Sequence, residues 1–227
     1  MRKRKLSIFI LITAVCLGIF GVANATPVFV TVKFDGNVYG VPVNGVGTGP
    51  YGLNVPASST SESLWFCFSD LQTISGGQSW NAVMLSTSEL QAMPNLYPVG
   101  GAAAISEVAY LADLTPGKTG NDLANVNVAM WLVNGGFANP PAGGVVYAND
   151  AINNHSNDFQ AAEFLMPVKV NPNGGQCDAG DISGCVYDSA TDRQPFVHPP
   201  VVPEPGTLLL LGAGLVGLVG LRWKRAL

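Results

Sequence analysis

Positive charge is scarce in the body of this sequence. Of its 11 lysine and arginine residues, four lie within the first five positions and three within the last six, so four remain between these ends. All 15 acidic residues, counting Glu204, lie in the same stretch. A strongly acidic surface does not attract nucleic acid or anionic lipid. We therefore predict that nucleic acid is not a partner of this protein.

Histidine and the common catalytic motifs are also scarce. The chain has two histidines, His155 and His198, and neither lies at metal-ligand spacing from a cysteine or an aspartate. It has no G-x-S-x-G segment and no phosphate-binding glycine loop. We predict no metal, no cofactor and no catalytic residue, and hence a protein that is not an enzyme. We expect both histidines to be exposed polar side chains.

The N-terminus has the three parts of a secretory signal peptide. Basic residues open the chain, an apolar run covers residues 6–22, and an Ala-Asn-Ala cleavage site follows. We predict that cleavage falls between Ala25 and Thr26. Residues 1–25 are therefore a signal peptide, and the remainder of the chain is exported.

The C-terminus has a second apolar run, 207–221, between a Pro-Glu-Pro-Gly segment and a basic tail. As a helix this run rises about 22 Å, which is short of the ~30 Å hydrocarbon core, but Trp223 and the long basic side chains extend its effective span. We predict a transmembrane helix whose tail stays in the cytoplasm. The residues of this signal are Pro203, Glu204, Pro205, Gly206, Arg222, Lys224 and Arg225.

This three-part order resembles the PEP-CTERM sorting signal of exopolysaccharide-producing Gram-negative bacteria. The resemblance covers residues 203–227 and implies that an exosortase, a membrane cysteine protease, processes the protein there. The helix would hold the protein in the inner membrane before processing. Afterwards we expect it in the cell envelope, on the outer surface or in the extracellular matrix of a biofilm. A plain C-terminal membrane anchor is the alternative.

Between these ends we expect one exported domain, residues 26–195, followed by a Pro-rich linker, residues 196–202. Alternation predicts strands at 28–34 and 159–170, and an aromatic run predicts one at 64–68. Residues 79–85 are a further candidate strand, and 39–43 is a weak strand inside a Gly/Pro-rich stretch. Helical spacing predicts helices at 88–93, 101–114 and 121–132, and a short one at 150–154. This order predicts a mainly β domain with an α-helical insertion (α+β). Its form would be a β-sandwich or a barrel with a small helical subdomain.

The cysteines of the exported domain are odd in number. Cys67, Cys177 and Cys185 remain after the signal peptide is removed, in an oxidising compartment. Cys177 and Cys185 flank a loop rich in turn-forming residues, and we predict a disulfide between them. The two aspartates of that loop are too few for a calcium site, so we expect solvated turn residues. Cys67 lies in an aromatic run, where a buried thiol packs as a small hydrophobic group.

Three segments resemble bacterial surface thioester domains. They are Phe66-Cys67-Phe68-Ser69-Asp70, residues 106–112, and the helical stretch 126–131 that ends in Trp131. In that family the cysteine sulfur displaces ammonia from a glutamine amide, and the resulting internal thioester acylates amines on a target. Here Asn127 stands at the glutamine position, and its missing methylene holds the carbonyl about 1.5 Å nearer the backbone, too far for reaction. The resemblance implies a degenerate pair, Cys67 and Asn127, that lies close together without a covalent bond.

These patterns together predict a secreted, exosortase-sorted envelope or matrix protein with a structural or adhesive role. Its predicted partners are the exosortase, the membrane before processing, and exopolysaccharide as a candidate. Two alternatives stay open. A carbohydrate-binding module requires exposed coplanar aromatic rings, for which Trp80 is the best candidate. A polysaccharide hydrolase requires two facing carboxylates.

Overall fold

The computed structural model of the chain describes residues 27–69, 74–155, 162–171, 175–189 and 193–199. The predicted signal peptide and the predicted sorting signal lie outside these ranges. Within them, no helix combines the length and the apolar character that crossing a membrane requires.

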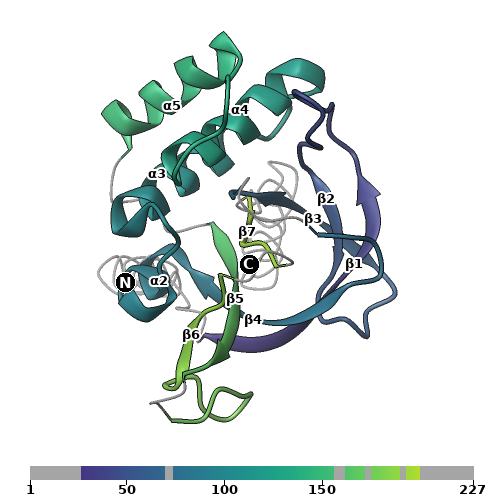
Figure 1. Cartoon of the computed structure of the whole chain (residues 1–227), viewed down its shortest axis with the longest axis vertical. Helices are drawn as coiled ribbons and strands as arrows, with labels where there is room; N and C mark the ends of the chain where they lie inside the picture. Colours follow the sequence, from purple (N-terminus) through teal and green to yellow (C-terminus); the bar gives the residue numbers. More distant parts are fainter. Residues whose placement is uncertain (1–26, 70–73, 156–161, 172–174, 190–192, 200–227) are drawn as a thin grey trace, which may run out of the picture.

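A closed antiparallel barrel forms the body of the described domain (Figure 1). Its six strands are β1 (Val28–Val38), β2 (Tyr51–Asn54), β3 (Glu62–Cys67), β4 (Ser79–Ser86), β5 (Glu163–Val170) and β7 (Phe196–His198). They pair in the order β4-β1-β2-β3-β7-β5, and a further pairing of β4 with β5 closes the ring. A short strand, β6 (Cys185–Tyr187), pairs with the second half of β5. Of the two predicted forms, the barrel is therefore the correct one.

Alternation along each strand separates two apolar clusters. In β3 the side chains of Trp65 and Cys67 belong to a cluster drawn from the facing barrel strands, whereas Phe66 packs with residues of the helices. This is the period of two that a strand imposes on its side chains. The first cluster fills the barrel interior with large side chains. It comprises Val32, Phe34, Tyr51, Leu53, Trp65, Cys67, Trp80, Ala82, Leu165 and Phe196.

The helices form one insertion between two neighbouring strands. They are α2 (Thr87–Gln91), the 3-10 turn η1 (Pro94–Leu96), α3 (Gly101–Asp113), α4 (Gly120–Val133) and α5 (Ala142–Asn154). All five follow β4 and precede β5, and Figure 1 shows α3, α4 and α5 gathered against one side of the barrel. A capping box of Ser86 and Glu89 begins α2. The predicted helical insertion is therefore confirmed.

Helix α5 is longer than the predicted 150–154. Its first three residues, 142–144, lie at the end of the stretch 135–144, whose glycines and prolines predict a loop. Gly143 and Gly144 are nevertheless inside the helix. A Cβ at Gly144 would lie 2.8 Å from a methyl carbon of Val128, and one at Gly143 would lie 2.3 Å from the amide nitrogen of Asn125. The glycines are therefore where α5 packs closest to α4.

The predicted linker 196–202 is wrong at its start. Residues 196–198 form β7, which pairs with β3 on one edge and with β5 on the other. Phe196 and Val197 are both fully buried, one in the interior cluster and the other against the helices. Pro195 and Pro199 flank the strand without entering it, as a strand paired on both edges requires. Three residues between prolines are too few to show a period of two.

Candidate functional site

Asn127 lies where helix α4 meets the barrel, and its amide joins two strand ends. Its nitrogen donates to the Cys67 carbonyl (2.6 Å), and its oxygen accepts the Gly49 backbone N–H (2.6 Å). The β2–β3 register pairs Tyr51 with Trp65, so two residues further on Gly49 and Cys67 would face each other. The fully buried amide therefore occupies the place of the next ladder bonds between the two strands.

Two further side chains hold the same end of β3, and they belong to Trp131 of α4 and to Asn134, the C-cap residue that follows the helix. The Trp131 indole nitrogen donates to the Cys67 carbonyl (2.9 Å), and the Asn134 amide nitrogen donates to the Phe68 carbonyl (2.9 Å). With Asn127 they occupy positions i, i+4 and i+7, which share one helix face. The sequence singles out Asn127 and Trp131, but we did not predict a role for Asn134. Asparagine also occurs at positions 121, 125 and 127 of α4, so the residue type alone does not single out Asn134.

The Cys67 thiol belongs to the barrel interior. It is fully buried and donates to the Ser69 carbonyl (2.9 Å). Burial, and to a smaller extent the Cys67 thiol, raises the pKa of Tyr51 above its usual range, which places these two groups in the same interior. The structure thus brings Cys67 and Asn127 together through the backbone of Cys67. Both polar ends of the Asn127 amide bind main-chain groups, which is the geometry of a structural tie.

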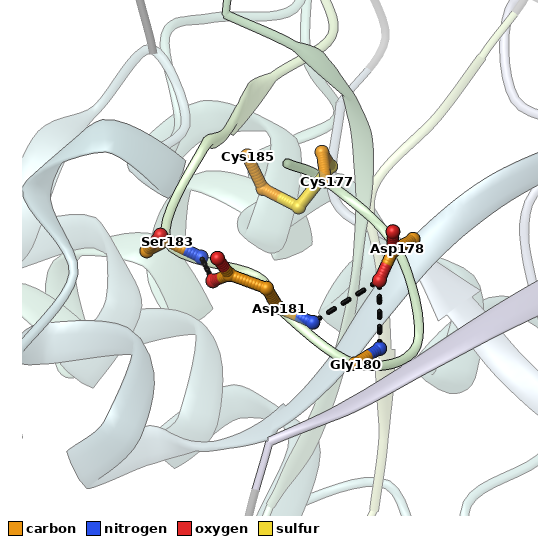
Figure 2. Close-up of a disulfide and its surroundings, with 6 residues drawn as sticks. All are labelled: Cys177, Asp178, Gly180, Asp181, Ser183 and Cys185. Atoms are coloured by element: carbon orange, nitrogen blue, oxygen red, sulfur yellow. Dashed lines mark hydrogen bonds between the residues drawn. A yellow bond between two sulfur atoms is a disulfide. The ribbon is translucent and has the colours of Figure 1, made fainter. Parts of the chain in front are cut away.

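The predicted disulfide between Cys177 and Cys185 is confirmed, with the two Cα atoms 4.7 Å apart (Figure 2). The aspartates of the loop it closes organise the turn. One Asp178 oxygen accepts from the Gly180 and Asp181 backbone nitrogens, at 2.7 and 3.1 Å. Hydrogen bonds from the Ser183 side chain and backbone N–H hold the pKa of Asp181 below its usual value. In the described parts of the chain, no three histidine, cysteine or acidic side chains gather as metal ligands do.

A polar seam lies between α3 and α5. The Tyr110 hydroxyl donates to Asp150 (2.7 Å). Glu107, on the same helix, is 9% exposed, and burial raises the pKa of its carboxyl more than the nearby His155 lowers it. A carboxyl that is costly to ionise makes the packing of these helices sensitive to pH.

One mouth of the barrel opens into a hollow of about 970 Å³. Strands β1, β3 and β5 begin at this mouth, and β2, β4 and β7 end there. Its lining includes Val28 of β1, Ala57 after β2, Trp65 of β3, Met84 of β4, Glu163 of β5 and His198 of β7. Every barrel strand thus reaches the hollow, directly or through the residues next to it. Ala179 of the disulfide loop also borders it.

The expectations for His198 and Trp80 need correction. His198 is half-buried, and its ring packs edge-on against Trp65 at a centroid distance of 4.9 Å. Trp80 is 4% exposed and stacks on Phe196 in the barrel interior. Trp65 and Trp131 are buried as well. The described tryptophans therefore form no exposed platform on which a sugar ring could stack.

Comparison with known proteins identifies the C-terminal segment. Residues 201–225 match the family model of the PEP-CTERM protein-sorting motif. The chain matches no curated protein and no solved structure. The motif marks an extracellular or cell-surface protein of bacteria that is sorted by exosortase. The sorting residues from Pro203 to Arg225 and the cleavage pair Ala25 and Thr26 lie outside the described residues. The resemblance to thioester domains gains no support from these comparisons and stays a prediction.

Proposed function

We propose that the exported domain is a structural or adhesive component of the cell surface or the extracellular matrix, and that it does not act as an enzyme. The sorting motif at residues 201–225 carries this proposal. Exosortase delivers the domain, and the domain then acts through its outer surface.

Three properties of the described domain support a role as a building block. Large side chains fill the barrel interior. A disulfide suited to an oxidising compartment ties residues 177–185. Buried main-chain groups at the end of β3 are bound by side chains of α4 and of its C-cap residue, which fixes the helices to the barrel. Each of these rigidifies a scaffold, and such a scaffold suits adhesion or assembly.

A deletion in the native host tests the role. We expect cells without the protein to lose surface attachment or matrix cohesion, and a copy lacking residues 203–227 to fail to restore it because it is not sorted. The full chain should restore it. Attachment and matrix that are unchanged in the deletion strain would contradict the proposal.

Carbohydrate binding and polysaccharide hydrolysis remain alternatives without a specific observation in their favour. The described tryptophans are buried. Among the described residues that line the barrel mouth, Glu163 is the only carboxylate, whereas glycoside hydrolysis uses two. Co-sedimentation of the exported protein with exopolysaccharide from the host tests the first alternative, and release of reducing ends tests the second.

A further inference from the structure

Val28 and His198, which lie near the two ends of the described chain, both line the barrel-mouth hollow. The predicted signal-peptide cleavage leaves Thr26 as the first residue, two positions before Val28, which lines the hollow. At the other end His198 also lines the hollow, and Pro203 of the sorting motif follows five residues later. The two ends that pass through the membrane machinery therefore leave the same face of the domain.

Chain length limits how far the sorting motif can lie from this face. Five residues span at most about 17 Å when fully extended, and the nine residues from His198 to Thr207 span at most about 30 Å. The barrel itself is of similar length, since the eight residues of β4 extend about 26 Å. An enzyme that binds the motif therefore reaches the mouth of the barrel, whereas the opposite end lies a full strand length further away.

The chemistry of the mouth favours a protein partner over lipid. The lining contains the apolar side chains Val28, Val30, Val55 and Met84. Among the described lining residues there is no lysine or arginine, and Glu163 adds a negative charge. Anionic lipid headgroups attract basic residues, which this surface does not offer. An exposed apolar hollow with a polar rim is instead typical of a protein contact.

We propose that the barrel mouth is the docking face on which the membrane-embedded exosortase holds its substrate. An apolar surface of the enzyme covers the hollow while the sorting motif lies in the active site, and cleavage then frees the mouth. This inference rests on the proposed sorting of the chain by exosortase, and it adds the surface that makes the contact.

Photo-cross-linking of the full chain in its host tests the docking face. A benzophenone amino acid replaces Ser58, an exposed residue of the hollow, in one variant and Ser75 in the other. Ser75 is also an exposed serine, and it precedes β4 at the opposite end of the barrel. An exosortase whose nucleophilic cysteine is replaced traps the complex. We expect a covalent band with the enzyme from position 58 and none from position 75.

A longer tether provides an independent check. An insertion of about twenty Gly and Ser residues between Pro199 and Pro200 lets the barrel move away from the enzyme. We expect this variant still to be processed by active exosortase but to lose most of the cross-link at position 58. An undiminished cross-link at position 58 would contradict the argument that the short tether holds the mouth on the enzyme.

The outcomes separate the inference from the sorting itself. Normal processing together with equal cross-links at both positions, or with lipid as the only product at position 58, overturns the docking face and leaves the sorting intact. If the wild-type chain keeps Trp223 in its exported form, the sorting fails and the inference fails with it.

Discussion

Replacement of Asn127 by alanine should strongly destabilise the domain. This side chain is fully buried and binds two main-chain groups, the Cys67 carbonyl and the Gly49 N–H. Alanine favours the helix more than asparagine does, so the substitution removes both bonds without weakening α4 itself. The decrease in unfolding free energy therefore measures how strongly this side chain holds α4 against the barrel.

The two hydrogen bonds of Asn127 differ in cost, because only one of its two partners keeps another hydrogen bond when the side chain is removed. The Cys67 carbonyl keeps its bond from Trp131, so losing the Asn127 donor costs about 1 kcal/mol. The Gly49 N–H is buried and loses the acceptor that the structure gives it, which costs about 1–3 kcal/mol. The sum is about 2–4 kcal/mol of unfolding free energy, or a fall in Tm of about 4–16 °C for a domain of this size.

Urea unfolding of the exported, disulfide-bonded protein measures this loss. The matched control is Asn121→Ala, which makes the same change at an exposed position of the same helix and should shift stability by less than about 0.5 kcal/mol. A value for Asn127→Ala that equals the control would refute the reasoning, because it would show that the amide does not bind the strand ends in solution. Asn127→Gln should also destabilise, by about 1–3 kcal/mol, since the fully packed site has no room for another methylene.

Three further predictions concern the disulfide, the ends of the chain and pH. Replacing Cys177 and Cys185 together by serine should cost about 2–3 kcal/mol from the entropy of the short loop, by urea unfolding; an unchanged midpoint contradicts this. Terminal peptide mapping of the protein from its host should find Thr26 first and no Trp223, and recovery of Trp223 would indicate a plain anchor. Because burial raises the pKa of Glu107, the folded state holds that proton more tightly than the unfolded chain. The wild type should thus lose stability relative to Glu107→Gln as the pH rises above about 4, and parallel pH profiles would contradict the shift.

The sequence predicts those parts of the fold that have a clear local pattern. Residues 79–85 begin with alternating polar and apolar side chains and form most of β4. Helical spacing places α3 and α4 within a residue or two of their bounds. The short loop between Cys177 and Cys185 is enough to predict their disulfide. In each case the residues next to one another in the sequence are enough to predict the structure.

Local sequence patterns do not predict features that depend on residues distant in the chain. Strand β7 has three residues, and it is a strand because β3 and β5 pair with it on both edges. Trp80 lies among glycine and serine, which suggests exposure, yet the opposite barrel wall buries it. The pairing of Asn127 with Gly49 requires the register of β2 against β3, which no local pattern contains.

The position of β7 in the chain also has a kinetic consequence. The strand pairs Phe196 with Cys67, which precedes it by more than half the length of the chain, so a long loop must close before this pair forms. During export β3 and β5 emerge before β7. Each of them therefore has one edge with unpaired backbone groups until β7 arrives. Exposed edges of this kind are sites of aggregation. We therefore expect export to require rapid transit, or a chaperone on the far side of the membrane, until residue 198 has crossed it.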